Sequence, residues 1–224
     1  MTFDLRRRLA AEVLGTAILV ATVVGSGIMA TKLTKDVGLA LLGNTVPTGA
    51  ILVVLILIFG PVSGAHFNPA VSLVMAQRAQ LPWREVAPYV VAQVIGGIAG
   101  SLIAHLMFDL PVWQASQTVR AGGAQWFAEF VATFGLVLTI FGVVRFRPES
   151  VPMAVGLYIT AAYWFTASTS FANPAVTIAR AFTDTFAGIA PASVPAFVVA
   201  QLVGAVAASA VSVWVFTPQP QPKT

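Results

Sequence analysis

The chain has 224 residues, of which 58% are hydrophobic and only 9% are charged, and its mean hydropathy is +0.87. Soluble domains carry about 25% charged residues, so this balance excludes a soluble domain and predicts a protein that crosses the membrane several times. The net charge of +4 is too small and too dispersed to indicate nucleic-acid binding, and the lack of cysteine excludes disulfides and cysteine-based metal or redox sites.

Six long apolar segments, separated by polar or basic links, predict an all-α membrane protein with six transmembrane helices. A helix needs ~20 residues to cross the hydrocarbon core of a bilayer. In chain order the predicted spans are about Leu9–Ala30, a segment within Val37–Phe59 entered near Pro47, Val86–Phe108, Ala124–Val144, Val151–Ala167 and Ala192–Phe216.

Two shorter apolar runs, Pro69–Ala79 and Pro174–Phe182, follow the second and fifth spans. Asparagine before proline predicts a helix start, because the asparagine side chain caps the helix and proline suits its first turn. Both runs are too short to cross the membrane, and paired short helices in two halves point to a site near the midplane. Together with the asparagine that precedes it, each run begins with the same tripeptide. The two copies are Asn68, Pro69 and Ala70, and Asn173, Pro174 and Ala175.

The two halves of the chain repeat each other. Ala11–Thr16 is similar to Ala128–Thr133, and Val90–Gly96 is similar to Val198–Gly204, with an Asn-Pro-Ala run between them in each half. An odd number of spans per repeat forces the halves to insert with opposite topology. We therefore expect one transmembrane domain, residues 1–224, built from inverted repeats at about 9–108 and 124–216, whose half-helices meet head to head.

The distribution of lysine and arginine predicts the orientation. With six spans both termini lie on one side, which carries eight of these residues against four on the other, and the excess places both termini in the cytoplasm. The eight are Arg6, Arg7, Arg8, Arg78, Arg84, Arg145, Arg147 and Lys223, and the four are Lys32, Lys35, Arg120 and Arg180.

The paired Asn-Pro-Ala runs inside an inverted repeat resemble the major intrinsic protein family, the aquaporins and aquaglyceroporins. The resemblance covers nearly the whole chain, including the approach Ser63-Gly64-Ala65-His66 and a glutamate in the first and fourth spans, Glu12 and Glu129. It implies a passive channel in the lipid bilayer rather than an enzyme, with no cofactor or metal. It also implies a homotetramer in which each protomer carries its own pore.

The family pattern assigns a physical role to the two half-helices. Their N-termini bring about half a unit of positive charge each to the midplane. The amides of Asn68 and Asn173 can cap their helices and still point N–H donors into a pore. Backbone carbonyls supply the acceptors along such a pore, and we expect them from Gly64, Ala65, His66, Ser170, Phe171 and Ala172.

The residue after the second Asn-Pro-Ala departs from the family pattern. That residue is usually an arginine, which narrows the outer constriction and repels cations, whereas here it is Val176. The resemblance places Thr48, Tyr163 and Ser170 at the other filter positions, with Thr160 or Ala161 as alternatives to Tyr163. Such a filter has no fixed charge and suits a neutral, polyhydroxy solute better than water alone.

Thr169–Thr177 resembles a valine-containing subset of the family that is found beside bacterial arsenic-resistance genes. The implied substrates are undissociated arsenite, methylated arsenicals and glycerol-like polyols, crossing the bacterial inner membrane. A water-selective channel is the alternative. An ion-coupled transporter is a further alternative, but Glu12 and Glu129 are the only acids within spans, and we place both near the cytoplasmic ends, where they hydrogen-bond the loops.

Arg180 has two interpretations. It lies four residues after Val176, so it either lines the outer vestibule or pairs with Asp184. Two pairs of small residues, Gly96 with Gly100 and Gly204 with Ala208, predict close contacts between helices.

Overall fold

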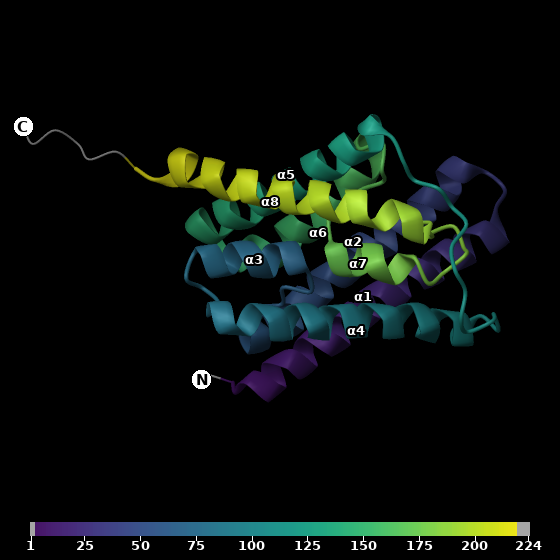
Figure 1. The fold of residues 1–224 in the computed structure, drawn as a ribbon, viewed down its shortest axis with the longest axis horizontal. Coiled ribbons are helices and arrows are strands. Elements are labelled where there is room, and N and C mark those ends of the chain that lie inside the picture. The colour runs from purple at the N-terminus through teal and green to yellow at the C-terminus, as the bar shows by residue number, and fades with distance from the viewer. Residues whose placement is uncertain (1–2, 219–224) are drawn as a thin grey trace, which may run out of the picture.

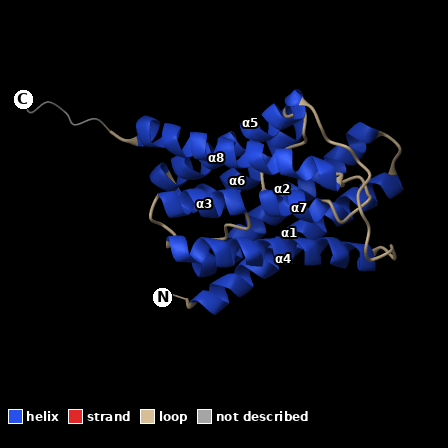
Figure 2. Cartoon of the chain, viewed as in Figure 1, coloured by secondary structure: helices blue, strands red, loops and turns tan. Residues whose placement is uncertain are grey.

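The computed structural model describes residues 3–218, and within that range all regular secondary structure is helical (Figure 2). The single 3₁₀ turns η1 (Pro148–Ser150) and η2 (Pro191–Ser193) precede two of the helices. The two short α-helices are α3 (Pro69–Gln77) and α7 (Pro174–Arg180). The six long ones are α1 (Leu5–Leu33), α2 (Val37–Ser63), α4 (Trp83–Met107), α5 (Gly123–Phe146), α6 (Val151–Phe165) and α8 (Val194–Phe216).

Five of the long helices, α8 together with η2 among them, are long and apolar enough to cross a membrane. The sixth, α6, has 15 residues and continues the turn η1. At 1.5 Å per α-helical residue and 2.0 Å per 3₁₀ residue, the two together extend about 28 Å, close to the hydrocarbon thickness of ~30 Å. The predicted architecture of six long helices and two half-helices is confirmed.

The second span differs from its prediction at both ends. Helix α2 begins at Val37, well before Pro47, runs through Pro47 and Pro61, and ends at Ser63. Proline has no N–H to donate to the Gly43 carbonyl one turn back, yet the helix continues through Pro47, packed against α1 and α6. The helix stops at Gly64, whose φ of +88° is the left-handed conformation that glycine adopts without strain.

The two halves pack in the same way. Helix α1 makes its most extensive contact with α4, and α5 makes its most extensive contact with α8. At Gly96 of α4 an added Cβ would collide with the Val13 carbonyl of α1, and at Gly204 of α8 it would collide with the Phe130 carbonyl of α5. The predicted close helix contacts are therefore present.

The half-helices α3 and α7 lie nearly in line, with their N-termini facing each other in the middle of the bundle (Figure 1). The described chain begins and ends at the same end of the molecule, whereas α5 begins at the opposite end (Figure 1). Glu12 is near the start of α1 and Glu129 is near the start of α5, so the two acids lie in opposite halves of the molecule, each beside a loop that reaches its centre. The placement of both acids near the cytoplasmic ends is therefore wrong. Inversion of the second repeat is the reason. Lys223, which entered the orientation count, lies outside the described residues.

Candidate functional site

The asparagines of the two Asn-Pro-Ala runs cap the half-helices that they precede. Asn68 Oδ1 accepts a hydrogen bond from the Ala70 N–H at 2.9 Å, and Asn173 Oδ1 accepts from the Ala175 N–H at 2.9 Å and the Val176 N–H at 3.2 Å. Proline follows each asparagine in the first turn, where its missing N–H leaves no helix bond unmade. The helix starts therefore fix both amide side chains at the centre of the molecule.

Each asparagine amide also reaches the loop of the other repeat. Asn68 Nδ2 donates to the Ala172 carbonyl at 2.8 Å, and Asn173 Nδ2 donates to the Phe67 carbonyl at 2.7 Å. One of the two hydrogens of each amide is thus used to join the repeats, which leaves one for a solute. The Ala172 carbonyl, predicted to be an acceptor in the pore, thus accepts from Asn68, and the equivalent Phe67 carbonyl was not predicted, although both residues directly precede an asparagine.

The loops before the half-helices have an unusual backbone. Ala65 and Phe67 have φ of 50° and 49°, and the corresponding Ser170 and Ala172 have φ of 50° and 48°. Left-handed conformations of non-glycine residues cost about 1–3 kcal/mol each and persist only where the surroundings enforce them. The alternation turns successive peptide groups in different directions, so some carbonyls can face a cavity while the N–H groups face away from it.

A buried carboxylate holds each loop. Glu12 accepts the N–H groups of His66 and Phe67 at 3.0 and 2.6 Å. Glu129 accepts the corresponding N–H groups of Phe171 and Ala172, both at 2.9 Å. Both acids therefore hydrogen-bond the irregular backbone.

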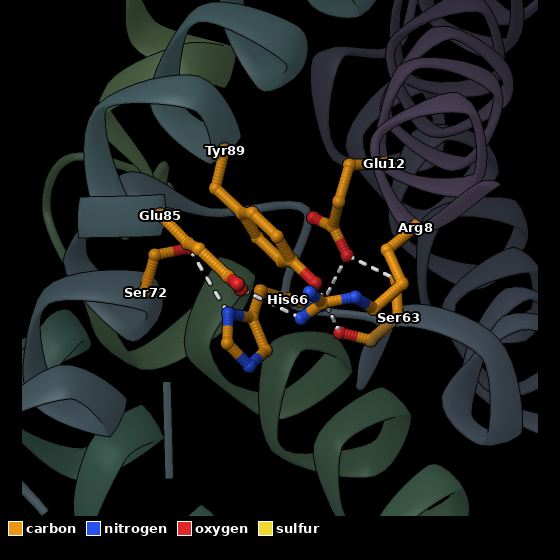
Figure 3. A network of polar contacts seen from close by, with 7 residues as sticks. All are labelled: Arg8, Glu12, Ser63, His66, Ser72, Glu85 and Tyr89. Carbon is orange, nitrogen blue, oxygen red and sulfur yellow. Dashed lines mark hydrogen bonds and ion pairs between the residues drawn. The ribbon is translucent and has the colours of Figure 1, made fainter. Parts of the chain in front are cut away.

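Further polar contacts brace the first loop from α1 and α4 (Figure 3). Ser63 Oγ donates to Glu12 at 2.6 Å, and the Tyr89 hydroxyl donates to the Ser63 carbonyl at 3.0 Å. The imidazole Nδ1 of His66 lies 3.0 Å from Ser72 Oγ. In the same region an ion pair of 2.7 Å joins Arg8 to Glu85 (Figure 3).

A cavity of about 140 Å³ runs past both loops and both asparagines. Its wall includes all six residues expected to contribute carbonyls, namely Gly64, Ala65, His66, Ser170, Phe171 and Ala172. Most of the remaining wall is apolar and was missed by the sequence analysis. A spacing of four residues along single helices is the signal that could have revealed it: Leu19 and Val23 in α1, Leu52 and Ile56 in α2, Leu136, Ile140 and Val144 in α5, and Val151, Val155 and Ile159 in α6.

The structure brings the four expected filter positions to this cavity, whose wall includes Thr48, Tyr163, Ser170 and Val176. The Tyr163 hydroxyl donates to Thr48 Oγ1 at 3.4 Å, so these two side chains meet across the cavity wall from α6 and α2. The alternatives to Tyr163 do not line it: Thr160 bonds the Gly156 carbonyl within its own helix, and Ala161 is exposed.

Arg180 lines the same cavity, and the alternative pairing with Asp184 is absent from the described residues. Asp184 is exposed and accepts instead from the Gln117 N–H at 2.9 Å. The Arg180 side chain is only 2% exposed, and its guanidinium lies over the Phe171 ring.

Comparisons with known proteins agree with this architecture. The family model described as Major intrinsic protein matches residues 1–161 and 146–223. The chain is 63% identical to aquaglyceroporin AqpS of Rhizobium meliloti, over 96% of this chain and 93% of that protein. It is 33% identical to the probable aquaporin AqpM of Archaeoglobus fulgidus, over 93% of this chain and 96% of that one.

Among solved structures, the fold is similar to the X-ray structure of the aquaglyceroporin from Plasmodium falciparum. The TM-score is 0.74 at 23% sequence identity, with 95% of this chain and 97% of that chain covered. This likeness concerns the fold, and the family model and the sequence relatives carry the assignment. The chain belongs to the major intrinsic protein family, and it is a multi-pass membrane channel rather than an enzyme.

Proposed function

We propose that this protein is a passive channel for small uncharged solutes across the bacterial inner membrane, with both termini in the cytoplasm. The substrates are glycerol-like polyols, undissociated arsenite and methylated arsenicals, together with some water. The observation that carries the proposal is the position of Val176, which lines the cavity together with Thr48 and Tyr163.

These three side chains give the constriction a mixed character. Two hydroxyls, 3.4 Å apart, offer hydrogen bonds on one side, and Val176 offers an apolar surface. A polyol or undissociated arsenous acid has hydroxyl groups and a less polar face, so it can match both surfaces at once. A side chain as short as valine also leaves more room than an arginine would.

The relatives support the same assignment. The 63% identical protein of Rhizobium meliloti is described as an aquaglyceroporin, and that identity extends over nearly the whole of both chains. The pattern Thr169–Thr177 resembles the family members found beside arsenic-resistance genes.

The carboxylates within the bundle argue against an ion-coupled transporter. Glu12 and Glu129 each accept two backbone N–H groups and a glutamine amide, from Gln93 and Gln201 respectively. Acids committed to holding loops in this way are poorly placed to bind and release a coupling ion.

The experiment that tests the proposal is solute influx into proteoliposomes, with water, glycerol and arsenite measured side by side at neutral pH. We expect all three fluxes to exceed those of empty vesicles, and we expect an imposed proton or sodium gradient to leave them unchanged. Water flux without glycerol or arsenite flux would show a water-selective channel, and gradient-driven accumulation would show a transporter.

A further inference from the structure

The two half-helices present equivalent faces to the cavity. At α7 the lining residues are the capping Asn173, then Val176 three positions later and Arg180 seven positions later. In α3 the equivalent positions are Asn68, Val71 and Met75, and all three also line the cavity. Residues three and seven apart share one face of a helix, so the two stripes lead away from the centre toward opposite mouths.

The two stripes differ in one respect. Their first residues are both asparagine and their second are both valine, but the third is Met75 in α3 and Arg180 in α7. The stripe of α3 therefore ends on an apolar thioether, and that of α7 ends on a guanidinium. Under the proposed orientation, the guanidinium lies toward the outside.

The guanidinium of Arg180 is held in place by two contacts. Its Nε donates to the Ala187 carbonyl in the segment after α7. Its Cζ lies 3.4 Å from the centroid of the Phe171 ring, a cation–π contact. Phe171 is itself fixed, because its N–H donates to Glu129 and its ring packs edge-on against Phe197.

The charge of Arg180 has no carboxylate partner in the part of the chain that the structure describes. The ion pairs there join Arg7 to Asp4 and Arg8 to Glu85, and Nη1 of Arg180 is buried without a hydrogen-bond partner. A second cation, Arg120, places its Cζ 5.1 Å from the same Phe171 ring but does not line the cavity. An unpaired buried charge is costly, so stability alone does not explain why one is kept beside the cavity.

We propose that Arg180 is the specificity-determining charge of the outer mouth, where it rejects cations and offers a donor to the oxygen of an incoming neutral solute. One helical turn, about 5.4 Å, separates it from Val176. The position keeps a positive charge on the pathway, while the constriction at Val176 stays wide and apolar. This inference rests on the proposed function, because it requires solutes to pass along the cavity.

The test compares variants of Arg180 in the full-length protein in proteoliposomes. Proton and methylammonium fluxes are measured and divided by the water flux of the same preparation. Arg180→Met installs the residue of the equivalent first-half position, and Arg180→Gln removes the charge but keeps a donor for the Ala187 carbonyl. We expect cation flux relative to water to rise at least about tenfold in both variants, because a nearby unit charge in a site of low effective dielectric contributes a barrier of this size.

Two further variants isolate the charge. Arg180→Lys keeps the positive charge without the planar fork, and we expect it to exclude cations as the wild type does. Arg120→Met removes the neighbouring cation that does not line the cavity, and we expect little change. Unchanged cation exclusion in Arg180→Gln, or a leak in Arg180→Lys equal to that in Arg180→Met, would overturn the inference.

A failure of the proposed function would give a different experimental result from a failure of the Arg180 inference. A wild-type protein that conducts water but neither glycerol nor arsenite would refute that function. The comparison of cation exclusion between wild type and Arg180→Gln would still be valid, because each value is normalised to water flux.

Discussion

At the scale of single residues, the same positions in the two repeats have the same tasks. The glutamate accepts hydrogen bonds from loop N–H groups, and the carbonyl of the residue before each asparagine accepts from the asparagine amide of the other repeat. Each asparagine also caps its own half-helix. These groups satisfy one another in the interior, where an unpaired polar group costs about 1–3 kcal/mol. The second residue after each Asn-Pro pair is a valine, and both valines line the cavity.

Val176→Arg tests the proposed constriction. The substitution puts a long, charged side chain with five donors into it, one turn from Arg180, while water in single file can still pass along the new donors. We expect glycerol and arsenite fluxes relative to water to fall at least about tenfold, which corresponds to about 1.4 kcal/mol in the barrier. Unchanged solute flux relative to water in Val176→Arg would show that Val176 does not face the pathway.

Asn68→Ala and Asn173→Ala test the central amides. Each variant loses a helix cap worth ~1 kcal/mol and the bond to the opposite loop. We expect lower folding yield and lower flux of every solute, measured as protein recovered in detergent and as transport per reconstituted protein. Normal transport by both variants would place the pathway away from these loops.

Glu129→Gln tests the loop-holding carboxylate. An amide nitrogen would replace one oxygen that accepts from the Phe171 or Ala172 N–H, so a donor would face a donor in a buried site. We expect a loss of about 1–3 kcal/mol in stability, seen as a lower midpoint of thermal unfolding in detergent. Glu149→Gln changes an exposed carboxylate in the same way and should leave the midpoint unchanged. Equal midpoints for the two variants would contradict a structural role for Glu129.

At the scale of elements, backbone contact between helices joins α1 to α4 and α5 to α8. The contacts depend on residues without a side chain, since a Cβ at Gly96, Gly100 or Gly204 would meet a carbonyl of the neighbouring helix. Such close approach favours dispersion contacts, which replace the hydrophobic driving force that helices in lipid lack.

Gly96→Ala tests this packing. The new methyl group collides with the Val13 carbonyl, and overpacking of this kind costs about 1–3 kcal/mol. Gly60→Ala is the matched control, because it places the same methyl group in a long helix with no atom within 4 Å. We expect Gly96→Ala to lower the thermal midpoint and Gly60→Ala to keep or raise it. Equal midpoints would show that α1 and α4 adjust without strain.

At the scale of the whole molecule, the pathway lies within one chain, since its wall comes from both repeats of a single protomer. We infer from the family resemblance that the protein assembles as a homotetramer with one pore per protomer. We expect native mass spectrometry in mild detergent to give four copies. A protein that remains monomeric and conducts fully would contradict the assembly but not the pore.

Local sequence was sufficient to predict the spans, the half-helices and the inverted repeat. The reason is that hydropathy, proline after asparagine and repetition act over a few residues. Every described helix end lies within four residues of its prediction, apart from the entry to α2. The predicted entry to α2 was wrong because proline by itself tends to end or kink a helix, whereas packing against α1 and α6 carries this helix through Pro47.

Only the tertiary structure decided which side chains meet. The bonds between Asn68 and Ala172 and between Asn173 and Phe67 join residues more than a hundred positions apart, which no local pattern relates. Similarly, the contact of Arg180 with Phe171 rather than Asp184 depends on how the loop before α7 folds back over that helix. The sequence alone determined that a membrane channel of this family would form, because membrane insertion responds to local hydropathy. Packing of the two inverted halves decided where its charge would lie.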